Sequence, residues 1–269
     1  MAMGKEELPD ELIQDIRQFY RDRANTDLYS TSPDFNLREI EIEYISRFLT
    51  DNQRVLDVGC GNGYSTLCYA ARVNSEFCGI DFVPEMITAA QDLRSRFQIK
   101  GSVTFQVGDV TQLRLRDSVF DTVISQRCLL NLPSREHQWQ ALAEIARVLR
   151  PGGRYLMLEG TIQGLQRLNT MRAKFGLPPI PEADPKSNWF SNKFDEEELS
   201  KNLAKLFTSV ETTQRFGMYF FLSRVVHPLL IAPKGPQYDA PINAIARQIC
   251  YQIPDFEGLG HVALWAIRK

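Results

Sequence analysis

Three glycines and an aspartate are the residues whose types and spacing most clearly predict chemistry. Gly59, Gly61 and Gly63 alternate directly after the apolar run Val55–Val58, at the start of a helical pattern. Glycine lets a ligand approach the backbone where a Cβ would collide, and a helix start offers free N–H groups to an anion. Asp81 ends the next apolar run. A carboxylate there can accept both hydroxyls of a ribose, so the pattern predicts a nucleoside cofactor.

The spacing of the glycines separates two classes of nucleoside cofactor. The motif reads Gly-x-Gly-x-Gly and follows Asp57. The dinucleotide fingerprint is Gly-x-Gly-x-x-Gly, which is shaped around a pyrophosphate. The sequence therefore disfavours NAD, and an NAD-dependent oxidoreductase is kept as the weaker alternative.

The elements that must position this loop follow from an alternation of short apolar runs with longer helical patterns. Such alternation is typical of βαβ units on a parallel sheet, which bind ligands at the carboxyl ends of their strands. The expected strands are Arg54–Val58, Glu76–Asp81, Val103–Val107, Phe120–Ser125, Arg154–Glu159, Ser209–Arg215 and His261–Arg268. The expected helices are Tyr64–Val73, Pro84–Gln98, Arg135–Leu149 and Asp195–Leu206.

Three stretches do not follow this rhythm: residues 1–49, about 160–194 and about 216–260. The second and third leave the sheet near strand ends that point the same way, so we expect them to fold over one edge. The prediction is therefore a Rossmann-like α/β core over residues 50–269. A helical lid would be formed by the N-terminal 1–49 and by the two insertions.

Four motifs occur in order along this core. LDVGCGNGY at Leu56–Tyr64 opens the first helix, Val107–Val110 follow the third strand, Phe120–Gln126 form the fourth, and Leu149–Arg154 turn into the fifth. Together they resemble the motifs of the class I S-adenosylmethionine-dependent methyltransferases, with order and spacing intact from Val55 to Glu159. The resemblance implies a Rossmann-like methyltransferase sheet, S-adenosylmethionine as cofactor and methyl transfer as the activity.

The resemblance also implies roles for individual residues. The three glycines would pack on the cofactor, Asp81 would bind its ribose, and Asp109 would accept from the adenine amino group. The other residues implied in cofactor binding are Phe82, Val110, Ser125, Gln126 and Arg127. Related small-molecule methyltransferases bind the cofactor carboxylate with an N-terminal Arg and Tyr, for which Arg38 and Tyr29 are the candidates. A solvated helix arginine and a packed tyrosine are the alternatives.

Two side chains are candidates for a general base. His227 lies in the apolar part of the third irregular stretch, and histidine titrates near neutral pH. Glu159 lies at the carboxyl end of the fifth strand. Methyl transfer from an activated sulfonium depends largely on alignment, and an amine acceptor needs only its lone pair. Structural roles for both side chains therefore stay open as alternatives.

Two parts of the sequence indicate the class of methyl acceptor: the end of the fourth strand and the lid. Ser125–Cys128 differs from the Asn/Asp-Pro-Pro-Tyr/Phe motif of methyltransferases that act on planar amide or adenine nitrogens. The lid segments Glu159–Asn169 and Arg224–Pro228 are similar to methyltransferases of bacterial secondary-metabolite and sugar-modifying pathways. We therefore expect methyl transfer to an N or O atom of a small polar metabolite. A methyltransferase-like scaffold that binds cofactor without turnover is the alternative.

Polar side chains recur at helical spacing in the insertion after the fifth strand. Gln163, Arg167 and Lys174 would share one helix face, with Arg172 nearby. The pattern is typical of a solvated charged face, and a patch for an anionic substrate is the alternative.

Composition restricts the partners. Lys and Arg total 31 against 33 Asp and Glu, so no sequence-wide positive field would gather a phosphate backbone, and we expect no nucleic-acid partner. The five cysteines lack a C-x-x-C pair, so no metal site is predicted. The N-terminus lacks the apolar stretch of a signal peptide, and residues 218–232 are too short to span a membrane, so we expect a cytoplasmic protein. The sequence makes no prediction of oligomeric state.

Overall fold

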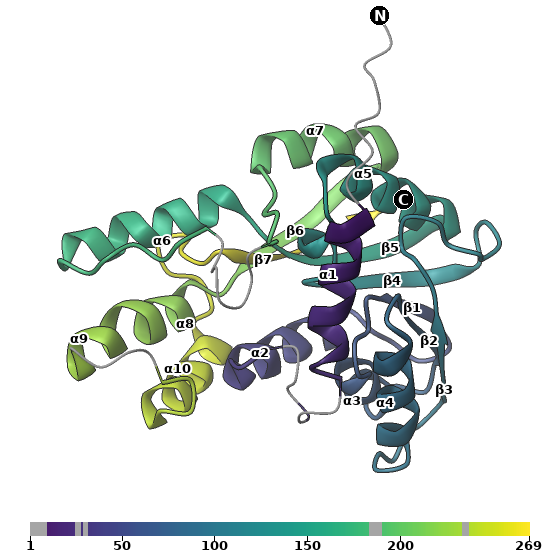
Figure 1. Cartoon of the computed structure of the whole chain (residues 1–269), viewed down its shortest axis with the longest axis horizontal. Coiled ribbons are helices and arrows are strands. Elements are labelled where there is room, and N and C mark those ends of the chain that lie inside the picture. Colours follow the sequence, from purple (N-terminus) through teal and green to yellow (C-terminus); the bar gives the residue numbers. More distant parts are fainter. Residues whose placement is uncertain (1–9, 25–27, 29–31, 183–189, 233–236) are drawn as a thin grey trace, which may run out of the picture.

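In a computed structural model of the chain, one seven-stranded sheet lies between two layers of helices (Figure 1). The structure describes residues 10–24, 28, 32–182, 190–232 and 237–269. The strands are β1 Arg54–Val58, β2 Glu76–Asp81, β3 Ser102–Val107, β4 Phe120–Gln126, β5 Leu149–Gly160, β6 Ser209–Arg215 and β7 Val262–Arg268.

The strand order is β3-β2-β1-β4-β5-β7-β6. Strands β1 to β5 pair in parallel, whereas β7 is antiparallel to both β5 and β6. The first residue of β7, Val262, therefore pairs with the last residue of β5, Gly160. Because β6 is antiparallel to β7, it runs in the same direction as β1 to β5, so one edge of the sheet collects the carboxyl ends of six strands and the amino end of β7.

Alternate side chains of each strand enter two hydrophobic clusters, one on each face of the sheet. In β5, Leu156 and Leu158 belong to one cluster and Tyr155 and Met157 to the other. The first cluster includes side chains of α2 (Phe35–Ser46), α3 (Tyr64–Ala70), α4 (Pro84–Arg94), α8 (Gly217–Phe221) and α10 (Pro241–Gln252). The second includes side chains of α5 (Arg135–Val148) and α7 (Glu196–Leu206), which Figure 1 shows on the opposite side from α3 and α4. Because both faces are buried, the strands read as near-continuous apolar runs.

The expected elements agree with the observed ones in type and order. β1, β2 and β6 have the predicted bounds, and β3 and β4 are each one residue longer. β5 begins at Leu149 rather than Arg154, because Leu149 pairs with Phe120 before a register shift. α3 and α4 end earlier than predicted, at Ala70 and Arg94.

The apolar stretch after β6 folds as three short helical pieces. They are α8, the π-helical segment Leu222–Val226 and α9 His227–Ile231. Tyr219, Phe220 and Val225 are fully buried in the core cluster that also holds α2. Within the described parts of the chain, we find no helix with the length and apolar character needed to cross a bilayer.

The N-terminal region contains two helices with different surroundings. α1 (Asp10–Arg21) lies across the carboxyl edge of the sheet (Figure 1). α2 has eight buried residues, among them Ile40, Ile42 and Ile45, which pack in the core. Asp34 caps α2 by accepting from Leu37 N at 3.1 Å, and it also accepts from the Tyr219 hydroxyl at 2.6 Å. One carboxylate thus ties the start of α2 to α8.

Candidate active site

The loop after β1 holds its three glycines in the left-handed region. The φ angles of Gly59, Gly61 and Gly63 are 68°, 55° and 76°. A residue with a Cβ is disfavoured in this region by roughly 1–2 kcal/mol. The backbone of the loop therefore requires glycine before any ligand is considered.

The surroundings of these glycines differ. Gly59 and Gly61 line a deep cavity, whereas Gly63 does not. A Cβ on Gly59 would lie 2.3 Å from Sγ of Cys128, and a Cβ on Gly63 would lie 2.7 Å from the Phe105 ring. Gly63 precedes α3 as its N-cap residue. This geometry argues against the predicted cofactor contact of Gly63, whose role is to let α3 pack closely against β3.

The carboxylate of Asp81 lies opposite the glycine loop. Its Oδ2 accepts from Gly61 N at 2.9 Å, and its Oδ1 accepts from Val83 N at 3.0 Å. Each carboxylate oxygen has a second acceptor position, and Asp81 lines the cavity. The side chain thus positions the loop and can still accept two hydroxyl groups. Burial raises the pKa of Asp81 to about 6, although these backbone donors oppose the shift.

This pKa predicts a pH dependence of ligand binding. The ionised form of Asp81 accepts hydroxyl donors, so a nucleoside ligand must displace a proton when the pH lies below about 6. We expect the dissociation constant of S-adenosylhomocysteine to be flat above pH 6 and to rise by about tenfold per pH unit below it. Calorimetric titration across this range measures the effect.

Two other buried carboxyls require a control for that experiment. Burial raises the pKa of Asp57 and of Glu159 to about 7. Asp81→Asn removes only the titration of Asp81. A pH dependence that persists unchanged in Asp81→Asn would assign it to another group.

Three further residues predicted to bind the cofactor line the same cavity: Phe82, Asp109 and Val110. Asp109 Oδ1 accepts from the backbone N and the hydroxyl of Thr111 at 2.8 and 2.7 Å, which fixes the orientation of the carboxyl. Because these residues follow β2 and β3, the parallel pairing of the two strands brings them together.

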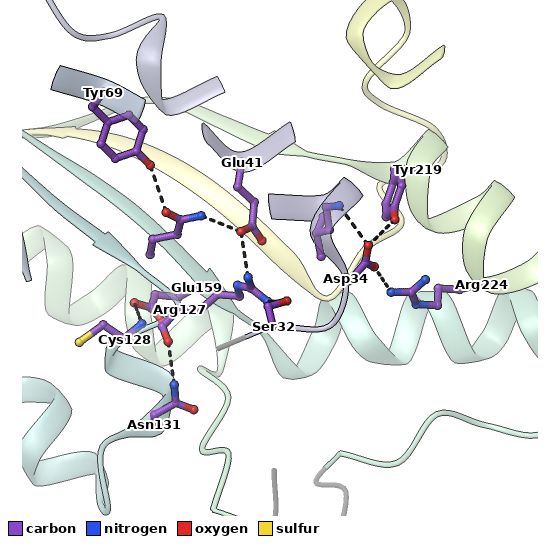
Figure 2. Close-up of polar contacts among 12 residues, drawn as sticks. Ser32, Asp34, Glu41, Tyr69, Arg127, Cys128, Asn131, Glu159, Tyr219 and Arg224 are labelled. Atoms are coloured by element: carbon purple, nitrogen blue, oxygen red, sulfur yellow. Dashed lines mark hydrogen bonds and ion pairs between the residues drawn. The ribbon is translucent and has the colours of Figure 1, made fainter. Parts of the chain in front are cut away.

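A polar network fixes the end of β4 (Figure 2). The Tyr69 hydroxyl donates to Gln126 Oε1 at 3.1 Å, and Gln126 Nε2 donates to Glu41 Oε2 at 2.8 Å. Arg127 forms an ion pair of 3.2 Å with the same carboxylate. Gln126, Arg127 and Arg38, three of the residues predicted to bind the cofactor, all line the cavity.

Arg38 is not a solvated helix residue. Only 8% of it is exposed, and burial lowers its pKa to about 10. Its place on the cavity wall is consistent with the predicted contact to a cofactor carboxylate. The second candidate for that contact, Tyr29, lies outside the described residues.

Ser125 and Glu159 lie behind the cavity wall. Both are fully buried, neither lines the cavity, and the Ser125 hydroxyl donates to Glu159 at 3.0 Å. The Glu159 carboxylate accepts backbone N–H groups of Cys128, Leu129 and Leu130 at 3.2, 3.0 and 3.1 Å. Figure 2 shows this carboxylate beside Cys128. The geometry argues against a cofactor contact for Ser125 and a base role for Glu159, because Glu159 positions the turn after β4.

His227 also lies away from the cavity. It begins α9, is 2% exposed and does not line the cavity. Burial lowers the pKa of His227 below its ordinary value, and the charge of Arg224 adds to the shift. The predicted base role is therefore not favoured by the position of this ring.

His261 is a cavity residue that sequence reasoning missed. It directly precedes β7, and its ring lies 4.8 Å from the ring of Phe220. Its Nδ1 is buried and has no hydrogen-bond partner among the described residues. An antiparallel direction of β7 would have predicted this position, because the start of an antiparallel strand lies beside the carboxyl ends of its parallel neighbours.

The predicted polar face of α6 (Ile162–Lys174) contacts other elements. Gln163 Nε2 donates to Asp195 at 2.5 Å, and Arg167 forms an ion pair of 2.9 Å with Glu196. Neither Gln163, Arg167 nor Lys174 lines the cavity. Gln163 and Arg167 attach α6 to the start of α7, and Lys174 is exposed, so the three do not form the anionic-substrate patch that was one alternative.

The cavity has a volume of about 970 Å³. This lies near the upper end of the roughly 300–1,000 Å³ typical of small-molecule sites. One wall consists of the loops after β1 to β4 described above. The rest of the lining includes Ile16 and Phe19 of α1, Leu165 of α6, Lys193, Arg224 and His261.

Comparison with known proteins identifies the family of this site. A family described as "Methyltransferase domain" matches residues 55–153. Residues 55–153, which carry the glycine loop and Asp81, are therefore similar to a methyltransferase domain. Demethylmenaquinone methyltransferase of Lactiplantibacillus plantarum is 37% identical over 113 residues, which cover 41% of this chain and 46% of that protein. Ajmaline N-methyltransferase of Rauvolfia serpentina is 32% identical over 106 residues, which cover 39% of this chain and 35% of that protein.

These matches to methyltransferases span less than half of each relative's length. The solved structure of a SAM-dependent methyltransferase from Methanosarcina mazei extends the likeness in fold. It covers 84% of this chain and 96% of its own, with a TM-score of 0.56 and 18% identity. At this identity the likeness concerns the fold alone.

The site of this methyltransferase domain fits the cofactor of its family. Gly59 and Gly61 leave the backbone open to a ligand, and the Asp81 carboxylate has acceptor positions for two ribose hydroxyls. Arg38 lines the same cavity and is the candidate cation for the methionine carboxylate. S-adenosylmethionine bound here would supply an activated methyl group on a sulfonium.

Proposed function

We propose that this protein transfers a methyl group from S-adenosylmethionine to an N or O atom of a small polar molecule. The observation that carries the proposal is a single cavity that joins the family's cofactor residues to a wall of lid side chains. Asp81 and Arg38 lie on the cofactor side, and Lys193, Arg224 and His261 contribute to the other wall. A donor and an acceptor bound together would then react by in-line displacement.

We propose that α1 and the insertions after β5 and β6 together form the cover over the acceptor. Four side chains of α1, namely Ile13, Ile16, Phe19 and Tyr20, line the cavity. Phe19 also lies 5.1 Å from Phe190, so α1 packs against the insertion that follows β5. Such a cover excludes water and fixes the acceptor, which are the main contributions required for an activated donor.

A small-molecule acceptor is favoured by the size of this cavity and by the balance of charges. Two of the similar proteins, a demethylmenaquinone methyltransferase and ajmaline N-methyltransferase, carry the names of small molecules. The net charge of −2 gives no general attraction for a phosphate backbone. We therefore propose a metabolite rather than a nucleic acid as the partner.

The experiment is a screen of amines and hydroxyl compounds with methyl-labelled S-adenosylmethionine, with products identified by mass spectrometry. The full chain should produce a labelled product with at least one acceptor, and Asp81→Ala should not. Binding of S-adenosylhomocysteine without transfer to any acceptor would favour the scaffold alternative. Binding of NAD in preference to S-adenosylhomocysteine would favour the oxidoreductase alternative.

His227→Gln should leave turnover within about threefold of wild type, a change of under about 1 kcal/mol in the barrier. The reason is that His227 does not line the cavity where the acceptor would bind. Initial rates with the acceptor found in the screen measure this. A loss of about 10²–10⁴ in turnover with unchanged cofactor affinity would restore His227 as a general base.

A further inference from the structure

A short segment before α7 brings a lysine to the carboxyl end of β5. Residues 192–194 run beside this strand, and Phe194 N donates to the carbonyl oxygen of Gly160 at 2.9 Å. Arg135 of α5 donates to the carbonyl oxygen of Lys193 at 2.5 Å. The backbone of Lys193 is thus fixed from two sides, so its side chain starts from a defined place on the cavity wall.

The Lys193 side chain is a buried cation without a paired carboxylate. It is 7% exposed and lines the cavity. Its Nζ donates to Ser191 Oγ at 3.3 Å and to the backbone oxygen of Glu182. The Glu182 carboxylate attracts it from an exposed position, but no ion pair of Lys193 occurs among the described residues. A buried ammonium held only by neutral oxygens favours an anionic ligand.

His261 lies on the other side of the same glycine. Thr161 N donates to the carbonyl oxygen of His261 at 2.8 Å. A Cβ on Gly160 would lie 3.4 Å from that oxygen and 3.5 Å from Cγ of Lys193. Gly160 lines the cavity, so Lys193 and His261 flank one open point on its wall. The Nδ1 atom of His261 is buried without a hydrogen-bond partner among the described residues, and the charge of Lys193 acts on this ring.

The other cations near His261 already have counterions. The charges that act on its ring are Lys193, Arg224 and Arg127, and together with burial they lower the pKa of His261 to about 3. Arg224 pairs with Asp34 and Arg127 with Glu41, as Figure 2 shows. Lys193 is the member of this group whose charge is not matched among the described residues.

We propose that Lys193 and His261 form a subsite for an anionic group of the methyl acceptor, a carboxylate or a phosphate. Lys193 binds the anion as a charge-assisted donor, and the neutral His261 ring makes a hydrogen bond to the same molecule. This inference rests on the proposed function, because it assigns the substrate class of that site. It separates the acceptor anion from the cofactor carboxylate, for which Arg38 is the candidate.

The test uses the full chain saturated with S-adenosylhomocysteine and three probes of similar shape: 4-hydroxybenzoate, phenyl phosphate and the neutral 4-hydroxybenzamide. At least one anion should bind saturably at about millimolar or tighter and at least about tenfold more tightly than the amide. The anion that binds more tightly distinguishes a carboxylate site from a phosphate site. Ligand-observed NMR titration measures these affinities.

Lys193→Gln should lower the affinity for the preferred anion by at least about tenfold, and Lys193→Arg should retain anion binding. Lys174→Gln is the matched control, because Lys174 is exposed and does not line the cavity. Anion affinity should not change in that variant. The affinity of Lys193→Gln for S-adenosylhomocysteine should remain that of wild type.

Equal binding of acid and amide, absence of saturable anion binding, or wild-type anion affinity in Lys193→Gln would overturn the proposal. Equal losses of anion and S-adenosylhomocysteine affinity in Lys193→Gln would assign the ammonium to the cofactor and also overturn it. If Lys193→Gln does not fold, the comparison of acid and amide in wild type decides the matter. Failure of wild type to bind S-adenosylhomocysteine would instead contradict the proposed function.

Discussion

Asp81→Ala should lower the affinity for S-adenosylhomocysteine by about 10²–10⁴. The variant loses two charge-assisted hydrogen bonds to the ribose, each contributing about 1.5–3 kcal/mol. It also removes the oxygen that accepts from Gly61 N at 2.9 Å, so the glycine loop loses a support. Both effects act on the same site, and calorimetric titration of the folded variant measures their sum.

Two further variants separate these effects. Asp81→Asn keeps one side-chain oxygen that can accept from the backbone but lacks the charge. Its affinity for S-adenosylhomocysteine should therefore lie between those of wild type and Asp81→Ala. Asp121→Asn is the matched control, because Asp121 accepts from Arg54 N at 2.6 Å at the start of β4, away from the cavity. Its affinity should equal that of wild type. An unchanged dissociation constant in folded Asp81→Ala would exclude Asp81 from the cofactor site.

Gly61→Val should reduce cofactor binding by at least about 100-fold, a loss of roughly 2.7 kcal/mol or more. Gly61 has φ 55° and lines the cavity, so the new side chain occupies ligand space. A β-branched residue is also a clear outlier in this backbone region. S-adenosylhomocysteine titration and a thermal melt measure the two consequences in one preparation.

Gly63→Ala provides the contrast to Gly61→Val. Its Cβ would lie 2.7 Å from the Phe105 ring and 2.8 Å from Cβ of Ala90, so the cost falls on packing. We expect a loss of about 1–3 kcal/mol in unfolding free energy with cofactor affinity within about threefold. Near-native affinity in Gly61→Val would show that Gly61 serves only the turn and that the cofactor lies elsewhere.

The sheet was predictable because its central strands β1, β4, β5 and β7 are largely buried on both faces and its helices carry local signals. Asp195 precedes α7 and accepts from the N–H groups of Glu197 and Glu198 at 3.0 and 2.9 Å, as its type and position predict. This cap fixes one end of a helix that packs against α5. Glycine, proline and cap residues act locally, so they can be interpreted without the fold.

Side-chain direction at the site was harder to predict. Ser125 and Gln126 are neighbours, yet the alternation along β4 turns Ser125 toward the face of Val123 and leaves Gln126 on the cavity. Side chains two residues apart on a strand share a face, so Ser125 shares the face of the buried Val123. This alternation alone would have placed Ser125 behind the cavity wall. Glu159 was misjudged for a related reason, because its partners are backbone groups of a turn whose shape the sequence does not specify.

The lid depends on contacts that are distant in sequence. Lys193 and His261 flank Gly160 only because one segment pairs beside β5 and because β7 runs antiparallel on its other side. Neither residue type nor local spacing indicates that meeting. Most of the residues predicted to bind the cofactor lie on the βα loops and are therefore local in sequence, whereas the acceptor side is assembled from long-range pairing.

Calorimetric titration of the full chain with S-adenosylhomocysteine and, separately, with NAD tests the cofactor assignment most directly. The glycine loop, Asp81 and Arg38 predict saturable binding of S-adenosylhomocysteine that is lost in Asp81→Ala, and no comparable binding of NAD. Tight binding of NAD together with no heat from S-adenosylhomocysteine would contradict the account of this site.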